Sequence, residues 1–135
     1  MRVLVDTPVW SLALRRARPG PSPVVRELAT LLQEGRVVLM GPIRQEILSG
    51  LKTSEHFERL RGHLQAFPDV HLETADFEEA AVCFNRCRAK GLQGSNTDFL
   101  ICAVAARRHL AILTTDADFA GFRKVLPLLL HEPRS

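Results

Sequence analysis

The sequence predicts an α/β fold with a mostly parallel central sheet. Short apolar runs with the length and composition of buried strands alternate with longer segments whose apolar residues recur at helical spacing. Two of these runs, at residues 3–5 and 110–113, lead directly into acidic residues. Ligands of open α/β sheets bind just beyond the carboxyl ends of the strands, so we expect a functional site where these two runs end.

The first strand is predicted at residues 3–5, because this run is wholly apolar and ends at Asp6. Thr7-Pro8 then has the pattern of an N-cap followed by a first-turn proline, so a helix should begin at once. Three prolines between residues 18 and 23 predict a bend before the next helix, which is expected over 24–34.

A second strand is predicted at residues 37–40, after Gly35 as a helix C-cap. The next helix should run from Gly41 to about residue 51. Glu46 lies at the edge of its apolar stripe, so we expect this glutamate to be half-buried. A further amphipathic helix is predicted over 53–67, followed by a brief third strand at 70–72.

The second half of the chain repeats the alternation. A helix is predicted over 75–89, and another over 97–108 that is apolar almost all round, which indicates burial inside the fold. Asp98 lies in the first turn of that helix. After the apolar run at 110–113, residues 122–130 are expected to supply a last strand, which Pro127 would confine to a sheet edge.

The chain has 135 residues, which suits one domain covering 1–135 that buries about two thirds of its unfolded surface. Its three cysteines, Cys83, Cys87 and Cys102, are odd in number and lack C-x-x-C spacing, so we expect reduced thiols in a cytoplasm. Cys83 and Cys87 stand one helical turn apart and could share a metal, but buried packing is the favoured interpretation.

No export or membrane segment is expected. Strand-like sequence begins at residue 2 without a charged and apolar leader, and the longest apolar run, at 99–106, is far shorter than the roughly 20 residues that span a bilayer. The sequence therefore predicts a soluble, cytoplasmic protein.

The formal net charge is +3, from 18 basic and 15 acidic residues. This excess alone is weak support for a polyanionic partner. Basic residues are bunched, however, and an acidic centre within a basic surround suits a phosphodiester substrate. The alternative for any one bunch is a solvated helix face. The three bunches are Arg15-Arg16-Arg18, Arg86-Arg88-Lys90 and Arg107-Arg108.

Four carboxylates stand out by position: Asp6, Glu46, Asp98 and Asp116. Each has a structural explanation when taken alone; Ser95 and Asp98, for example, fit a capping box. Four like charges at one sheet edge would nevertheless repel strongly unless they are protonated or bridged by cations. The set as a whole therefore favours a site that binds cations.

Oxygen ligands of this kind suit Mg²⁺ or Mn²⁺. Two such ions can activate water and stabilise both the attacking and the leaving oxygen at a phosphorus atom, which is nuclease chemistry. Thr7 and Thr115 are expected to add hydroxyls beside the acids, and Asp118 is a candidate outer ligand.

The pattern of Asp6-Thr7 after the first apolar run, Glu46 in the next segment, Asp98-Phe-Leu-Ile-Cys-Ala103 and Thr-Thr-Asp116-Ala-Asp-Phe119 resembles the PIN domain, and specifically VapC-type toxins of toxin–antitoxin pairs. The resemblance covers essentially the whole chain and implies a three-layer α/β/α sandwich. It also implies a Mg²⁺- or Mn²⁺-dependent endoribonuclease with Asp6, Glu46 and Asp98 as core acids and Asp116 as the fourth, and with Asp6, Asp98 and Asp116 holding metal.

The same resemblance implies partners. Such toxins form homodimers, cleave structured RNA such as transfer RNA or a ribosomal RNA loop, and are silenced by a VapB-like antitoxin that lies across the active groove. We expect that groove among Trp10, Leu12, Leu14 and the helix from Val24, where core packing is the alternative. Pro8 departs from the Asn or Ser that many relatives carry there, which puts a polar contact to Asp6 or substrate in doubt.

Two other classes of protein share parts of this pattern. A PIN-like module that binds RNA or protein without cutting is disfavoured because all four acids are present. A phosphoacceptor signalling domain also gathers acids at strand ends, but it needs a lysine near the end of the last strand. The three lysines, Lys52, Lys90 and Lys124, fit that requirement poorly.

Overall fold

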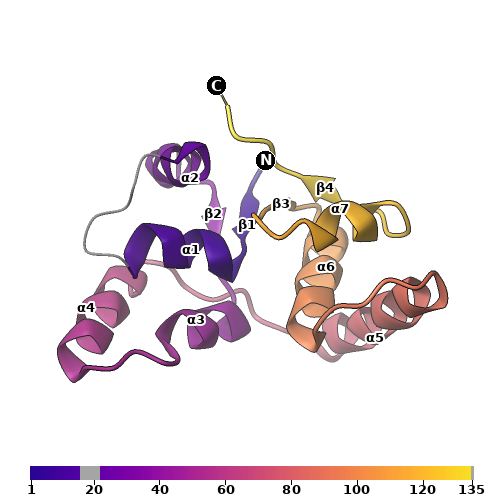
Figure 1. The fold of residues 1–135 in the computed structure, drawn as a ribbon, viewed down its shortest axis with the longest axis horizontal. Coiled ribbons are helices and arrows are strands. Elements are labelled where there is room, and N and C mark those ends of the chain that lie inside the picture. The colour runs from indigo at the N-terminus through magenta and orange to yellow at the C-terminus, as the bar shows by residue number, and fades with distance from the viewer. Residues whose placement is uncertain (16–21, 135) are drawn as a thin grey trace.

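The computed structural model describes residues 1–15 and 22–134, and its centre is a parallel sheet. Four strands lie in the order β2-β1-β3-β4 and every neighbouring pair is parallel (Figure 1). This confirms the predicted α/β class. The strands are β1 (Val3–Val5), β2 (Val37–Val38), β3 (Ala111–Leu113) and β4 (Leu129–Leu130).

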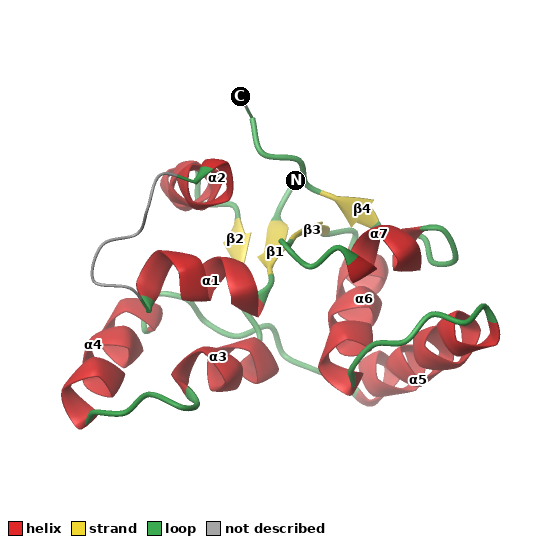
Figure 2. Cartoon of the chain, in the orientation of Figure 1, coloured by secondary structure: helices red, strands yellow, loops and turns green. Residues whose placement is uncertain are grey.

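Helices connect the strands, as parallel pairing requires (Figure 2). The predicted helices all form, although two end earlier than expected, at Leu48 and Leu64. The described helices are α1 (Thr7–Leu14), α2 (Pro23–Gln33), α3 (Gly41–Leu48), α4 (Ser54–Leu64), α5 (Thr74–Ala89), α6 (Asn96–Arg108) and α7 (Asp118–Arg123).

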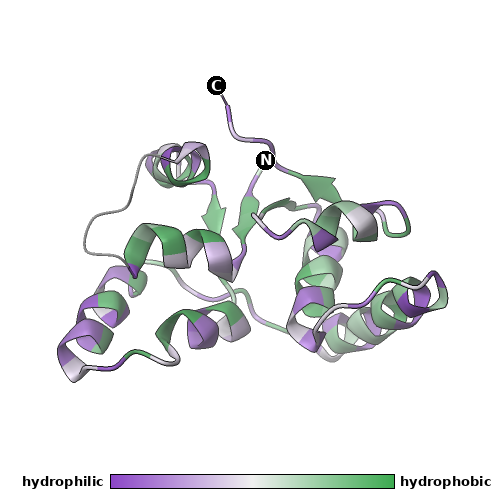
Figure 3. Cartoon of the chain, viewed as in Figure 1, coloured by the Kyte–Doolittle hydropathy of each residue, from purple (hydrophilic) through white to green (hydrophobic). Residues whose placement is uncertain are grey.

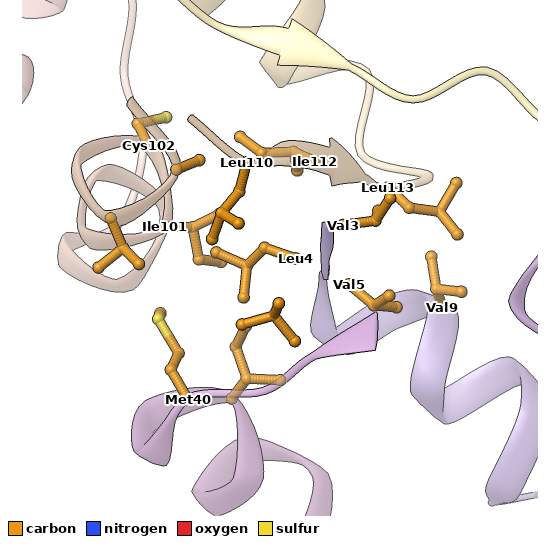
Figure 4. Close-up of a cluster of buried hydrophobic side chains, with 14 of the residues drawn as sticks. Val3, Leu4, Val5, Val9, Met40, Ile101, Cys102, Leu110, Ile112 and Leu113 are labelled. Carbon is orange, nitrogen blue, oxygen red and sulfur yellow. The ribbon is translucent and has the colours of Figure 1, made fainter. Parts of the chain in front are cut away.

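Both faces of the sheet are covered. Successive strand side chains point to opposite faces, yet all three residues of β1 are fully buried. Figure 4 shows Leu4 on the side of Ile101 and Met40, whereas Val5 lies beside Val9 of α1. Helix α6 therefore covers one face of β1 and helix α1 the other. The strands are uniformly hydrophobic, while the helices carry mixed faces (Figure 3).

The predicted third strand at 70–72 is absent and leaves one isolated parallel bridge between Leu39 and Asp69. Two peptide groups of this segment have partners without a ladder: the N–H of Val70 donates to the carbonyl of Leu39 at 2.9 Å, and the carbonyl of His71 accepts from Arg108 at 2.9 Å.

The last strand is an edge strand, as predicted, but it covers only Leu129–Leu130. The expectation of strand from residue 122 is wrong, because Phe122 belongs to helix α7. Phe119 and Phe122 are spaced i, i+3, and both are buried with their rings 5.3 Å apart. Helical spacing puts both rings against the core, which a strand would not do.

The chain end is tied to helix α2. Glu27 is buried, and its carboxylate accepts hydrogen bonds from the ring of His131 at 2.6 Å and from the backbone N–H of Arg134 at 3.1 Å. The same carboxylate contacts the guanidinium of Arg134. A buried carboxylate with this many donors is stable as a charge, so it fixes the segment after β4. None of the described helices has the length and apolar character needed to cross a bilayer.

Candidate active site

Strand β1 delivers Asp6 to the carboxyl edge of the sheet. Its side chain is 4% exposed, and Oδ1 accepts a hydrogen bond from the backbone N–H of Thr7 at 2.8 Å. Asp6 is therefore the N-cap of α1, one residue before the expected Thr7. The carboxylate that begins the helix is also the candidate metal ligand.

The neighbouring strand brings Thr114 to Asp6. Its hydroxyl donates to Oδ2 of Asp6 at 2.8 Å and accepts from the backbone N–H of Asp116 at 3.0 Å. Val5 pairs with Leu113 in the sheet. Asp6 and Thr114, the next residue on each strand, therefore lie side by side. The hydroxyl beside Asp6 thus belongs to Thr114 and not to Thr115, which is exposed and makes no side-chain hydrogen bond within the described segments. The strand register identifies Thr114, and the sequence alone does not give that register.

Asp116 and Asp118 shape the turn after β3. Oδ1 of Asp116 accepts from the backbone N–H of Asp118 at 2.9 Å, which starts helix α7. Asp116 is half-buried, whereas Asp118 is exposed and lines a hollow formed with Gly91, Leu92 and Gln93.

Asp98, a candidate metal ligand, also caps the start of helix α6. It is half-buried, and its Oδ2 accepts from the backbone N–H of Ser95 at 3.0 Å while the Ser95 hydroxyl accepts from the Asp98 N–H. The capping box foreseen as the structural explanation is therefore present. The box holds the carboxylate in one orientation at the helix start.

Glu46 joins the site through Thr7. The Thr7 hydroxyl donates to Oε1 of Glu46 at 2.7 Å, which links α3 to the first turn of α1. Glu46 is exposed, so the expectation of a half-buried side chain is wrong. Ile43 and Ile47 fill the buried stripe of α3, and the longer glutamate extends along the surface to its threonine partner.

Three of the acids interact electrostatically at this edge, because the charges of Asp98 and Asp116 act on the carboxyl group of Asp6. Burial raises the pKa of Asp6 to about 6, and the charges of Asp98 and Asp116 add to that rise. The hydrogen bonds that Asp6 accepts oppose it. A carboxylate whose pKa is raised by burial and by neighbouring carboxylates is stabilised in its charged form by a cation.

The fit to a divalent ion rests on this donor set. Mg²⁺ takes oxygen ligands and keeps several waters, so one or two carboxylates suffice to hold it. Within residues 1–15 and 22–134, no three histidine, cysteine or acidic side chains lie close enough to hold a metal jointly. The structure therefore does not bring Asp6, Asp98 and Asp116 close enough together for all three to contact one ion directly.

The three clusters of basic residues differ in their exposure and in their partners. Arg107 and Arg108 both bind Asp76 Oδ1 at 2.5 Å, and Asp76 is completely buried. These arginines are structural, and their pairing holds the pKa of Asp76 far below its usual range. Arg15 is exposed, and Arg16 and Arg18 lie outside the described residues. Arg86, Arg88 and Lys90 are exposed at the end of α5.

The expected antitoxin groove is wrong for Trp10, which is buried, donates its ring N–H to the carbonyl of Val5 at 3.2 Å and packs against Phe67. Val24 is buried as well, and Leu14 is half-buried against the core. Leu12 lines a surface hollow together with Pro8 and Thr115. The three cysteines are buried free thiols, as predicted.

Fold and site together define the class of this protein: a parallel α/β protein with carboxylates from separate segments gathered at the carboxyl edge of its sheet. The model of the PIN domain family matches residues 3–125, so the chain belongs to the PIN-domain family.

Solved structures show the same fold. FitAcB from Neisseria gonorrhoeae aligns with a TM-score of 0.76 and 22% identity over 97% of each chain. VapBC2 from Rickettsia felis, solved with a DNA fragment from its promoter, gives a TM-score of 0.76 and 18% identity over 97% of this chain and 98% of its own. A toxin–antitoxin complex from Klebsiella pneumoniae gives 0.67 and 20% identity over 98% of both chains. A search of curated protein sequences gave no significant match.

Proposed function

We propose that this chain is a metal-dependent endoribonuclease of the VapC type, acting in the cytoplasm as a toxin. The observation that carries the proposal is that Asp6, Asp98 and Asp116 come from three segments to one sheet edge, where the charges of Asp98 and Asp116 act on Asp6. Membership of the PIN-domain family supports nuclease chemistry, and the similar solved structures are toxin–antitoxin complexes.

In this proposal Asp6, Asp98 and Asp116 would hold Mg²⁺ or Mn²⁺ partly through bound water, and the ion would supply a lowered pKa of water and positive charge at the phosphate. Thr114 fixes the orientation of Asp6 and of the Asp116 backbone. Glu46, the fourth catalytic acid, is held at the entrance by Thr7 and can accept the proton of the attacking water. Asp118 supports the turn that carries Asp116.

The proposed substrate is structured cellular RNA, such as transfer RNA or a ribosomal RNA loop, where bases are unstacked and accessible. A cognate antitoxin is the proposed inhibitor, with a basic side chain among the acids. Asp6 favours such a partner, because a cation beside it offsets the burial, and the added charges of Asp98 and Asp116, that raise its pKa.

A homodimer is also proposed, through the outer face of α5 and α6. Phe77 is 53% exposed on this face and lines a hollow of about 540 Å³ together with Phe84 and Leu100. Large side chains of this kind are buried by a partner surface in stable oligomers. The mass of the purified chain in solution, compared between the parent and Phe77→Ser, tests this assignment; a monomeric parent contradicts it.

The function is tested with total RNA. The purified chain, free of antitoxin, is incubated with Mg²⁺ or Mn²⁺ beside Asp98→Asn, and new RNA ends are mapped by sequencing. Asparagine keeps an acceptor for the Ser95 N–H, so the variant should fold while losing most activity. Discrete ends that require both metal and Asp98 establish the enzyme. Folded protein that gives no such ends favours the module that binds without cutting.

A further inference from the structure

A surface groove leaves the acidic edge along helix α1. Its first part is a hollow of about 430 Å³ lined by Thr115 and four residues of the α1 segment. Those four, at positions 8, 11, 12 and 15, are spaced i, i+3, i+4 and i+7 and therefore share one face of the helix. Pro8 and Thr115 directly follow Thr7 and Thr114, the two threonines that contact the acids. The groove thus begins beside the candidate active site.

The groove continues past Arg15. A second hollow, of about 250 Å³, is lined by Arg15, Leu51, Lys52, Thr53 and His56. Because Arg15 lines both hollows, the two adjoin at this side chain and together extend from the acidic edge along α1 to the start of α4; Figure 1 shows α4 at that end of α1.

The far end of this path is suited to an anion. Arg15 and Lys52 are exposed, and neither forms an ion pair with a described residue. Residues 16–21 contain no acidic side chain that could supply one. Glu55 is the acidic residue in the first turn of α4, and it is exposed and absent from the lining of the hollow.

His56 supplies an independent observation. Its Nε2 is shielded from solvent and has no hydrogen-bond partner among the described residues. Its backbone N–H is satisfied by the Thr53 hydroxyl at 3.1 Å, so the orphan atom belongs to the ring alone. A buried polar atom without a partner costs free energy unless a ligand or water satisfies it. An unpartnered ring nitrogen thus belongs to a side chain that lines the second hollow together with Arg15 and Lys52.

We propose that this groove holds the substrate strand on one side of the cut, with a phosphate of single-stranded RNA bound by Arg15, Lys52 and His56. The inference rests on the proposed ribonuclease function and names its substrate track. Seven residues of α1 rise about 10 Å, so the phosphate held there is not the one that is cleaved. Pro8, Leu12 and Ser11 offer an apolar floor and a hydroxyl to the nucleotide between. RNA is favoured over an acidic protein because the path is continuous with the acids that act on a phosphodiester.

The test measures binding in an Asp98→Asn background, where the RNA is not cut. A fluorescent, mixed-sequence, single-stranded 20-nucleotide RNA is titrated with Mg²⁺ present between 50 and 200 mM salt. The double variant Arg15→Gln/Lys52→Gln should bind about tenfold more weakly, and the slope of log K against log salt should fall by about 0.7 for each phosphate that the protein no longer neutralises. The matched control is Arg123→Gln/Lys124→Gln, which removes the same two charges at the exposed end of α7 and should keep the parent slope.

A second measurement follows the ring carbon and proton signals of His56 by NMR while RNA or an oligoglutamate peptide is added. A shift with RNA that the groove variant abolishes supports the proposal. Equal slopes for the groove and control variants overturn it, and a His56 shift with the peptide but not with RNA reassigns the groove to an acidic protein partner. If the parent cuts RNA while the groove variant binds normally, only the inference fails. If the parent neither cuts nor binds RNA, the proposed function fails with it.

Discussion

The hydroxyl of Thr114 donates to Oδ2 of Asp6 at 2.8 Å, so a residue after β3 fixes the carboxylate that follows β1. The hydroxyl oxygen of Thr114 also accepts a hydrogen bond from the backbone N–H of Asp116 at 3.0 Å. One hydroxyl therefore joins two strand ends and two of the proposed metal-holding acids. We expect that removing this hydroxyl changes the ionisation of Asp6 more than it changes the packing of the core.

Thr114→Val should impair cleavage while Thr114→Ser retains it. Valine has the same shape but leaves Oδ2 of the buried carboxylate without its donor, and hydrogen bonds to charged groups contribute about 1.5–3 kcal/mol. The Thr114 hydrogen bond lowers the pKa of Asp6, so its loss should move the acidic limb of the pH–rate profile to higher pH. An unchanged profile in the valine variant would show that the hydroxyl does not act through Asp6.

Asp6→Asn should stabilise the metal-free chain at neutral pH. The pKa of Asp6 is raised from 3.8 to about 6 in the folded state, so the folded form binds the proton more tightly than the unfolded form does. The stability that this carboxyl provides is therefore complete below pH 4 and is lost as pH rises through 6, by about 3 kcal/mol.

Urea unfolding from pH 4 to 8 without divalent ions measures this effect. The difference between variant and parent should grow from pH 4 to about pH 6 and then level off, because the other titrating groups are common to both chains. A difference that does not depend on pH contradicts the assigned pKa.

Divalent metal should raise the melting temperature of the parent chain. An ion that binds only the folded form at a hundred times its Kd adds about 2.7 kcal/mol. Calorimetry with Mn²⁺ or a chelator checks this expectation, with Asp6→Asn as the control that should respond much less. Equal shifts in parent and variant would place the ion elsewhere on the chain.

Asp76→Ala should destabilise the fold without weakening RNA binding by the protein that remains folded. The substitution leaves Arg107 and Arg108 without their carboxylate, and breaking a buried ion pair by removing one partner costs about 3–5 kcal/mol. Denaturant unfolding measures the loss, and RNA titration below the transition tests the second half. Weakened RNA binding by the folded variant would contradict the structural assignment and show that Arg107 and Arg108 contribute to RNA binding.

Gly94→Ala should also destabilise, by about 1–3 kcal/mol. A Cβ at this position would lie 2.8 Å from Cζ of Phe122 and 3.1 Å from the ring of Phe99, inside a packed aromatic cluster. Gly62→Ala is the matched control, because a Cβ there meets nothing within 4 Å and alanine favours the α4 helix. Urea midpoints should therefore move in opposite directions, and a neutral Gly94→Ala would mean that the rings yield freely.

The sequence by itself determined the alternation of strands and helices, the first strand at Val3–Val5 and the order of the acids from Asp6 to Asp116. These features depend on local signals: apolar runs, helical spacing and capping residues act within a few positions of the chain. The capping box of Ser95 and Asp98 is of this kind, and the structure contains it.

Only the tertiary structure decided which side chains meet across long separations. The register that pairs Val5 with Leu113 selects Thr114 over Thr115, and the packing of α5 on α6 turns Arg107 and Arg108 into partners of Asp76. Such contacts arise from how whole elements dock, because a residue's neighbours across a sheet or between helices are set by the register and packing of both elements together. The sequence around Thr114, Arg107 or Arg108 contains no local pattern that identifies the residue with which each of them pairs.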